Sequence, residues 1–342
     1  MACFGVRLRR KLSRTRFVFW ISSLSGLGGS SMASHSIGLA LGSGSARGWS
    51  HIGVIQALRE MGIKPDVVSG CSIGALVGGA YTAGYLDDLC EWSKTLHKKD
   101  VVGFFDVSIM SGGLISGERI MNFFRGHVGD ITIESLSIPF AAVATDLGTG
   151  REIWLKSGSL LDAVRASISL PGIFSPVRIG DKWLVDGGLL NPVPVSVCRA
   201  MGADIVIAVN LNGGLVGKHF SYDQAKDIRA MKLHGMDKSS ITFTDRIKSG
   251  IQSGIDTVLS QVWRGESGAP GLFDVLASSI NIMQDRITRS RMAGDPPDLV
   301  LMPRLEHLGL LEFYRASEAI EEGRVCTEQA KQTIKRIIHY KK

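Results

Sequence analysis

The amino-acid sequence predicts an α/β fold in which helices cover both faces of a mainly parallel sheet. Three observations support this prediction. Short apolar runs alternate with helical patterns, and glycines gather where a run turns into a helix. The chain of 342 residues, 44% of them apolar, is long enough to bury a full core. Its 41 glycines follow no repeated period, which argues against a fibrous or low-complexity chain.

The first two units share the order strand, glycine-containing turn, helix. The run "IGLAL" at 37–41 leads into a glycine-rich turn and then a helical pattern, for which Gly62 provides the stop. The order repeats with an apolar strand that begins at Val67, a turn at Ser72, and a helix through "IGALVGGAYTAG" at 73–84. Small residues in that helix suit close packing against a sheet.

The remaining elements are predicted from later apolar runs and helical patterns. Further strands are expected at 140–145, 183–185, 204–211 and 299–303, and helical patterns at 116–126 and 313–338. Residues 213–270 are polar and weakly periodic, so they are interpreted as a long insertion or a mobile cover.

The net charge of +7 comes from the start of the chain. Six basic residues and no acidic residue fall within the first sixteen positions: Arg7, Arg9, Arg10, Lys11, Arg14 and Arg16. The rest of the chain is nearly neutral and gives no sign of a nucleic-acid surface. Three interpretations of this basic extension stay open: synthesis that starts at Met32, a peripheral membrane anchor, and a weak export signal. Residues 1–35 are therefore placed outside the fold.

The five cysteines are scattered, and none forms a C-x-x-C pair. This pattern supports neither a disulfide framework nor a zinc site. A reducing compartment fits the cysteine usage best. The predicted location is therefore cytoplasmic, with peripheral contact at the inner face of the membrane as an extension of that prediction and export less favoured.

Ser72 is the candidate nucleophile. The segment "GCSIG" places this serine between a strand and a helix, as in a nucleophile elbow, and such a turn needs glycines where neighbouring backbones come close. The alternative is a serine that only caps the following helix. The residues assigned to the elbow around the serine are Gly70, Cys71, Ile73 and Gly74.

The glycine-rich turn after the first strand is a candidate oxyanion hole, because unpaired amides at the start of a helix converge on an anion. Dinucleotide binding is the competing interpretation, but the glycine spacing is G-x-G-x-x-x-G and no P-loop lysine is present. We therefore expect no cofactor and no metal. The residues assigned to the oxyanion hole are Ser43, Gly44, Ser45, Ala46, Arg47 and Gly48.

Asp186 is the candidate general base. It ends an apolar strand and is followed by Gly187 and Gly188, which permit close approach of backbone or substrate. A carboxylate is a weak base towards a hydroxyl, so the role requires a direct hydrogen bond to Ser72 in a site poor in water. A turn-capping aspartate is the alternative.

Histidines offer the alternative of a conventional triad, since a histidine after Asp186 would complete the order Ser, Asp, His. The four that follow it are His219, His234, His307 and His339. None follows a strand in a clear loop. His51 is interpreted as a structural residue and Asp146 as a turn residue with a supporting role.

Taken together, these segments resemble the patatin-like phospholipase family, in particular small bacterial members related to neuropathy target esterase. The resemblance also includes "FAAVATDLGTGREIW", "AVRASISLPGIFSPV" and "RMAGDPPDLVL", and it covers nearly all of residues 37–301. One departure concerns the glycine-rich turn, where many members have G-G-G-x-[RK]-G and this chain has "GSGSARG".

The resemblance implies a three-layer fold and a lipid acyl-ester hydrolase with a dyad of Ser72 and Asp186. It also implies an oxyanion hole from amides of the 43–48 turn, with a lipid or acyl ester as substrate. Residues 37–211 would form the catalytic domain, and 212–342 a variable segment and a helical part that completes the fold. Two alternatives stay open: a Ser-His-Asp esterase or thioesterase, and a signalling or adaptor module with weak turnover.

Overall fold

The structure is a computed structural model, and it describes residues 35–104, 118–213 and 272–340. The chain divides into two units, Met1–Ala33 and Ser34–Lys342, and the fold described below is that of the second. The predicted extension at 1–35 and the predicted insertion at 213–270 lie almost wholly outside the described residues.

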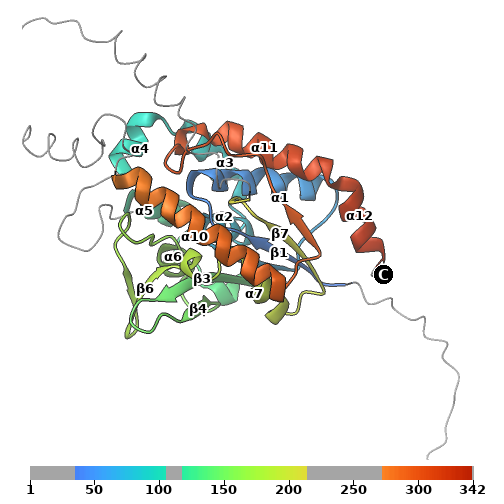
Figure 1. Cartoon of the computed structure of the whole chain (residues 1–342), viewed down its shortest axis with the longest axis horizontal. Coiled ribbons are helices and arrows are strands. Elements are labelled where there is room, and N and C mark those ends of the chain that lie inside the picture. Colours follow the sequence, from blue (N-terminus) through green and yellow to red (C-terminus); the bar gives the residue numbers. More distant parts are fainter. Residues whose placement is uncertain (1–34, 105–117, 214–271, 341–342) are drawn as a thin grey trace, which may run out of the picture. The chain divides into compact units, whose positions relative to one another are not determined.

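In the described part of the chain, eight strands form one sheet with the order β5-β6-β3-β2-β1-β7-β8, and β4 pairs with β3 (Figure 1). Neighbouring strands are parallel in the part of the sheet formed by β3, β2, β1, β7 and β8, while β4, β5 and β6 make antiparallel pairs. The strands are β1 (Ile37–Leu41), β2 (Val67–Cys71), β3 (Phe140–Asp146), β4 (Glu152–Leu155), β5 (Val177–Ile179), β6 (Lys182–Asp186), β7 (Ile205–Val209) and β8 (Leu299–Leu301). The predicted α/β class with a mainly parallel sheet is confirmed.

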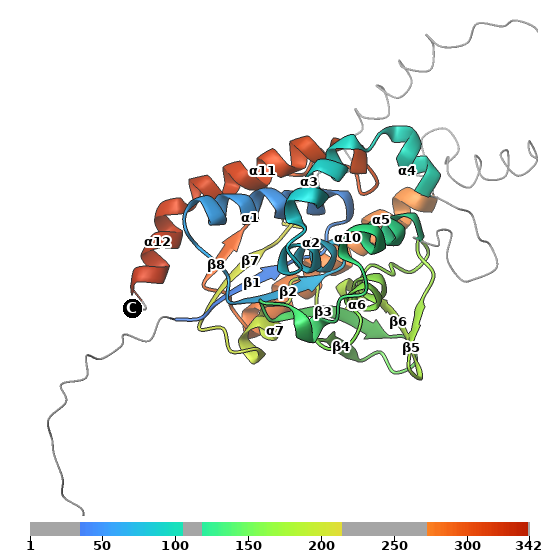
Figure 2. The same ribbon diagram turned by 180° about the vertical axis from the view of Figure 1, so that it is seen from behind.

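Helices cover both faces of this sheet (Figures 1 and 2). The helices are α1 (Ser50–Glu60), α2 (Ile73–Thr82), α3 (Leu86–Thr95), α4 (Lys98–Phe104), α5 (Glu118–Val128), α6 (Leu160–Ser167), α7 (Val195–Ala200), α10 (Leu272–Gly294), α11 (Ala316–Gln329) and α12 (Lys331–Tyr340). Short 3-10 segments are η1 (Ser45–Trp49), η2 (Ile133–Ser135), η3 (Gly187–Leu189) and η4 (Phe313–Arg315).

The central strands read as continuous apolar runs because both of their faces are buried. Leu39 and Leu41 of β1 belong to the core that includes residues of α1 and α2. Ala40, between them, packs in a second cluster that contains Val195 and Cys198 of α7. Alternate side chains of one strand thus enter two different cores, as expected for a sheet between two helical layers.

The ends of β2 and β6 meet along one edge of β3. Val143 pairs with Cys71 of β2 and with Trp154 of β4. The next residue, Ala144, pairs with Asp186 of β6 and again with β4. Since β4 occupies one edge of β3, β2 and β6 must follow each other along the opposite edge. Their carboxyl ends therefore face each other.

Three details differ from the sequence prediction. Strands β4 and β5 were not expected, and both are short, with only four and three residues. Strand β6 was expected within a mainly parallel sheet but is antiparallel to β3. The helical pattern at 313–338 is divided into η4, α11 and α12, and nothing in the local sequence explains the break at Ala330.

Candidate active site

Ser72 lies in a sharp turn between β2 and α2, with φ 57° and ψ −125°. A positive φ is costly for a residue with a Cβ, about 1–3 kcal/mol, and is often found at functional sites. Among the described residues, Ser45 is the only other non-glycine with a positive φ, 52°. Both of these strained serines line the same pocket.

The glycines on either side of Ser72 are required by close backbone contacts. A Cβ on Gly70 would lie 2.4 Å from the carbonyl oxygen of Gly74. A Cβ on Gly74 would lie 2.2 Å from the carbonyl oxygen of Leu41 in β1. Neither backbone position leaves room for a methyl group, so the G-x-S-x-G spacing has a steric cause here.

The side chain of Ser72 is hydrogen-bonded to Asp186. Its Oγ donates to Asp186 Oδ2 at 2.5 Å, and it makes no side-chain cap at the start of α2. The contact follows from the facing ends of β2 and β6, because Ser72 is the first residue after β2 and Asp186 is the last residue of β6. The two residues meet because β6 runs antiparallel to β3 whereas β2 runs parallel to it.

The carboxyl group of Asp186 is fully buried and has two hydrogen-bond donors. Ser72 donates to Oδ2, and the amide of Gly188 donates to Oδ1 at 2.7 Å. Burial raises the pKa of Asp186 from 3.8 to about 6, and the two hydrogen bonds oppose that rise. The carboxylate is therefore a stronger base than an exposed aspartate while remaining ionised at neutral pH.

Ser167, which has no catalytic motif of its own in the sequence, holds the backbone of Ser72. Its Oγ accepts from the amide of Ser72 at 2.9 Å and donates to the carbonyl of Val143 at 2.6 Å. The next turn also anchors the base, since the amide of Asp186 donates to the carbonyl of Ser169 at 2.9 Å. The end of α6 thus fixes both Ser72 and Asp186. The only sequence signal was the segment "AVRASISLPGIFSPV" that carries these serines.

Some backbone amides of the glycine-rich turn already donate hydrogen bonds within the protein, and others donate to none of the described residues. The amide of Ser43 donates to Pro192, that of Ala46 to Leu310 and that of Arg47 to Gly44. Within the described part of the chain, the amides of Gly44 and Ser45 donate to no protein group. Ser43, Gly44 and Ser45 line the pocket beside Ser72, whereas Ala46, Arg47 and Gly48 do not. The geometry thus narrows the six predicted residues to two candidate donors.

Arg47 is a buried cation that anchors the turn. Its Nε donates to the carbonyl of Gly44 at 3.3 Å and its Nη2 to Asn281 Oδ1 at 2.9 Å, while Nη1 has no hydrogen-bond partner among the described residues. Burial lowers the pKa of Arg47 to about 10. The guanidinium therefore remains charged at neutral pH and ties the oxyanion turn to α10.

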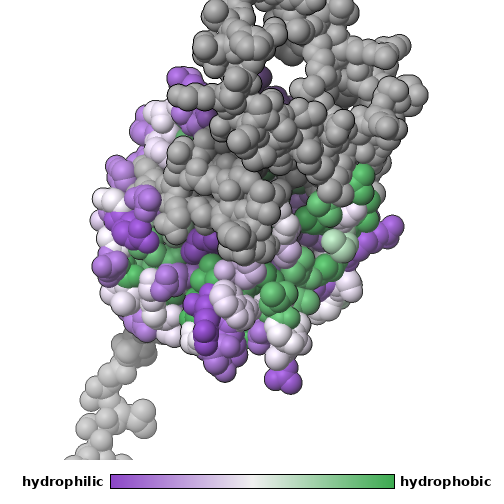
Figure 3. Space-filling view, turned by 90° about the vertical axis from the view of Figure 1, so that its left-hand side faces the viewer, coloured by the Kyte–Doolittle hydropathy of each residue, from purple (hydrophilic) through white to green (hydrophobic). Residues whose placement is uncertain are grey.

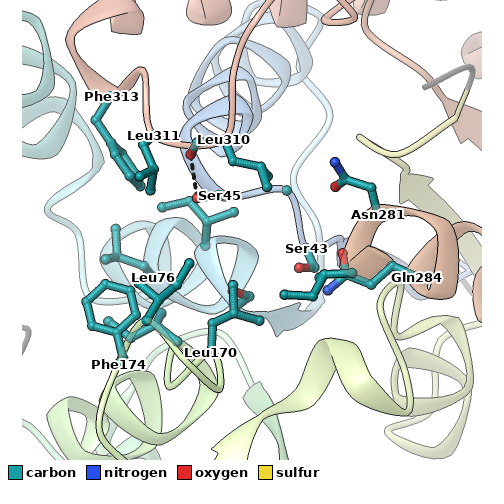
Figure 4. Close-up of a pocket in the computed structure, with 16 residues that line it drawn as sticks. Ser43, Ser45, Leu76, Leu170, Phe174, Asn281, Gln284, Leu310, Leu311 and Phe313 are labelled. Atoms are coloured by element: carbon teal, nitrogen blue, oxygen red, sulfur yellow. Dashed lines mark hydrogen bonds between the residues drawn. The ribbon is translucent and has the colours of Figure 1, made fainter. Parts of the chain in front are cut away.

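A pocket opens next to Ser72. Figure 4 shows Ser43, Asn281 and Gln284 on one side of it and the apolar residues Leu76, Phe174, Leu311 and Phe313 on the other. The dashed line in Figure 4 is the hydrogen bond from Ser45 Oγ to the carbonyl of Leu310, at 2.6 Å. The apolar residues that line the pocket are Ile73, Leu76, Ile168, Leu170, Ile173, Phe174, Ile280, Leu310, Leu311 and Phe313. This division matches a substrate with a polar ester and an apolar chain.

Gln284 of α10 lies close to Gly188, next to Asp186. Its Oε1 accepts from Asn212 Nδ2 at 2.9 Å, and its NH₂ group is the part of the side chain nearest to Gly188. A methyl group at Gly188 would lie 2.3 Å from Gln284 Nε2 and 3.0 Å from Asp186 Oδ1. Gly187 is equally constrained, since a Cβ there would lie 2.3 Å from the carbonyl of Val143.

The histidines and Asp146 are accounted for as follows. His51 is buried and bonded through Nε2 to the carbonyl of Gly42 at 2.8 Å, and burial lowers its pKa to about 4. His307 pairs with Glu318 at 2.8 Å on the surface, and His339 is exposed near the end of α12. Asp146 accepts from Gly148 and Thr149 in a turn. His219 and His234 lie outside the described residues.

The described residues also bear on metal sites, disulfides and membrane-spanning helices. These residues include no group of three or more potential metal ligands. Cys71, Cys90, Cys198 and Cys326 are free thiols. Within the same residues, no helix is both long and apolar enough to cross a bilayer.

Comparison with known proteins gives matches over most of the chain. The family model described as patatin-like phospholipase matches residues 39–199, which include Ser72 and Asp186. An uncharacterized NTE family protein of Mycobacterium tuberculosis is 36% identical over 328 residues, covering 86% of this chain and 91% of that protein. Neuropathy target esterase sws of Drosophila melanogaster is 34% identical over 187 residues, covering 53% of this chain and 13% of that protein.

These matches and the fold agree with one another. The matched region contains, in chain order, the glycine-rich turn at 42–48, the segment 70–74 around Ser72, and Asp186 with the two glycines after it. The match with the M. tuberculosis protein extends over nearly its whole length. The chain therefore belongs to the patatin-like phospholipase family, a family of lipid ester hydrolases.

Proposed function

We propose that the protein hydrolyses acyl esters of lipids through a dyad of Ser72 and Asp186. The observation that carries this proposal is the hydrogen bond of 2.5 Å from Ser72 Oγ to a fully buried carboxylate at the end of a largely apolar pocket. Burial strengthens the base, and the pocket offers an apolar wall for an acyl chain.

Acylation begins when Ser72 Oγ attacks the ester carbonyl carbon and its proton passes to Asp186 Oδ2. The oxyanion that forms accepts hydrogen bonds from the amides of Gly44 and Ser45. Collapse of the tetrahedral intermediate breaks the ester bond, and the leaving alkoxide takes the proton from Asp186. The acyl group remains on Ser72.

Deacylation repeats these steps with water as the nucleophile. Water attacks the acyl carbon while Asp186 takes its proton, and collapse releases the fatty acid. Ser72 Oγ regains the proton from Asp186. One carboxylate thus serves every proton transfer in both halves of the reaction, and the scheme uses neither a metal nor a cofactor.

The test is activity-based labelling with a fluorophosphonate, combined with product analysis on defined lipids. The wild type should be labelled on Ser72 and should release fatty acid. Ser72→Ala and Asp186→Asn should each lose several powers of ten in rate, and the double variant should be hardly worse than either, because the pair acts as a unit. Ser135→Ala and Asp162→Asn are matched controls at exposed positions.

Three outcomes would contradict the dyad. Near-normal turnover by Asp186→Asn would exclude it as the base. A loss of about a thousandfold on replacing His219, His234, His307 or His339 in a folded protein would favour a triad. Absence of both labelling and product would favour an adaptor module that keeps the fold without turnover.

A further inference from the structure

Helix α10 presents apolar side chains to the exterior. Positions seven apart lie on the same face of a helix, so the two pairs Val275–Ile282 and Leu276–Met283 form one stripe. Their exposed fractions are 41% for Val275, 46% for Leu276, 45% for Ile282 and 48% for Met283. Four large apolar residues on one outer face are more than the scattered exposure that a protein surface normally has.

The inner face of the same helix is polar. The side chains that α10 buries include Asn281 (6% exposed), Gln284 (4%), Asp285 (3%) and Thr288 (2%). A helix on the surface of a water-soluble protein ordinarily has the reverse arrangement, with apolar residues inside. Asn281 and Gln284 of this inner face line the pocket beside Ser72, while the side chains of the outer apolar stripe are 41–48% exposed.

The outer stripe continues into the pocket. Leu276, Ile280 and Met283 are spaced i, i+4 and i+7, so their side chains form one ridge along the helix. Ile280 lines the pocket that contains Ser72. Figure 1 shows α10 in front of the sheet, and in Figure 3, which turns that front to the right, hydrophobic surface gathers on the right. The acyl chain of a lipid that leaves a membrane along this ridge would therefore reach the pocket that contains Ser72.

Basic residues follow the apolar stripe on the same face. Arg286 lies one turn after Ile282 and is exposed. Arg289 lies a further turn along; its side chain is 66% exposed and pairs with Asp285 at 2.9 Å. An apolar face followed by arginines is the pattern of a helix that lies in a membrane interface, where the arginines meet anionic headgroups.

We propose that the outer face of α10 is the surface by which the protein lies on an anionic lipid surface and receives its substrate. The apolar stripe enters the acyl region, and Arg286 and Arg289 contact the headgroups. This proposal rests on the proposed function, since it supplies the lipid route to Ser72. The occupant is a lipid surface rather than a second protein because the apolar ridge leads into the catalytic pocket and the flanking charge is positive.

The first test uses the full chain and sedimentation with phosphatidylcholine vesicles that either contain or lack phosphatidylglycerol. Replacing two apolar side chains, in Ile282→Ser with Met283→Ser, should weaken vesicle binding about tenfold or more. The matched control is Leu147→Ser with Trp183→Ser, which removes two apolar residues, 56% and 51% exposed, from another part of the surface. Arg286→Glu should weaken binding only to the vesicles that contain phosphatidylglycerol.

The second test locates the contact independently of any other lipid-binding segment. A polarity-sensitive fluorophore on Met283→Cys should shift to the blue with vesicles and be quenched by brominated lipid, whereas one on Leu147→Cys should not. The unsubstituted chain, taken through the same labelling, gives the background from its own cysteines.

The outcomes separate this proposal from the catalytic one. The Ile282 and Met283 variants should hydrolyse a soluble short-chain ester at the wild-type rate and lose only vesicle hydrolysis. Unchanged vesicle binding with no fluorescence shift at position 283 would overturn the proposal. So would variants that bind vesicles normally but no longer associate with a second copy of the chain, because the stripe would then be a protein interface. Failure of the wild type on the soluble ester would instead count against the proposed function.

Discussion

At the scale of single residues, the proposed dyad requires the buried carboxyl group of Asp186 to be ionised so that it can accept the proton of Ser72. Burial raises its pKa to about 6, so the active form is lost as the pH falls below that value. We expect kcat/KM for a soluble ester to be level above pH 6 and to fall about tenfold per pH unit below it. A midpoint near the ordinary aspartate value would contradict the assignment.

Ionisation of the same carboxylate, which the proposed dyad requires, lowers the stability of the fold. Its folded pKa of about 6 exceeds the unfolded value of 3.8, so the folded state binds more protons between those two pH values. The free energy of unfolding therefore decreases as the pH rises through this window. We expect Asp186→Asn to unfold at a higher temperature than the wild type at pH 8 and at a similar temperature near pH 3. A less stable variant at pH 8 would show that the carboxylate is structurally required.

Ser167 is a positioning residue whose removal should affect the chemical step. Ser167→Ala deletes the group that accepts from the Ser72 amide and leaves two buried backbone groups without it. We expect kcat to fall about tenfold or more while KM for a soluble ester is unchanged, because the pocket wall is intact. Ser167→Thr, which keeps the hydroxyl, should restore most of kcat. Equal losses in kcat for both variants would indicate a packing effect instead.

The rate of fluorophosphonate labelling provides an independent readout for Ser167. A misplaced Ser72 should react slowly with the probe even when the fold is intact, whereas a merely less stable protein should be labelled at the normal rate below its unfolding temperature. Thermal unfolding of both variants separates these two cases.

At the scale of secondary-structure elements, α2 begins directly against β1, and this contact has a specific steric limit. A Cβ on Gly74 would lie 2.2 Å from the Leu41 carbonyl, which belongs to a central strand that cannot easily shift. On Gly78, in the same helix, a Cβ would lie 3.1 Å or more from side-chain atoms only. We expect Gly74→Ala to cost about 1–3 kcal/mol of stability and most activity, and Gly78→Ala to cost much less. Chemical denaturation of both variants would measure this difference.

The sequence predicted elements well where a buried strand leads into a helix through a glycine turn. The strands around Ile37 and Val67, and the helices after them, have the expected places. The sequence prediction missed β4 and β5. These strands have four and three residues, partly exposed, and so short a run shows no clear periodic pattern. Asp186 ends a strand, as the sequence predicted. That it faces Ser72 follows from two strands that meet end to end, which no local pattern encodes.

At the scale of the whole molecule, the basic N-terminal residues carry no group that the proposed chemistry needs. They account for most of the net charge of +7, while every residue of the candidate site follows Gly42. We expect a chain that begins at Met32 to hydrolyse soluble esters at the full-length rate. Binding of the full-length chain to anionic vesicles should decrease with salt, because charge attraction is screened. An inactive or unfolded shortened chain would contradict the expectation.

The candidate site itself was predictable only in part, because its parts come from distant segments. Ser72 and Asp186 have recognisable local motifs, so both could be selected as candidates from the sequence. Ser167 and Gln284 have none, and their roles depend on the packing of α6 and α10 against the sheet. An ordinary serine and an ordinary glutamine become important only through the partners that the fold gives them.

The facing ends of β2 and β6 also determine when the chain becomes capable of catalysis. Ser72 and Asp186 are 114 residues apart and are brought together only where both strands join the edge of β3. A chain still emerging from the ribosome, or one partly unfolded by heat, therefore carries a serine without its base. The proposed dyad makes such a species inactive, and the return of fluorophosphonate labelling during refolding should mark the moment at which the sheet closes.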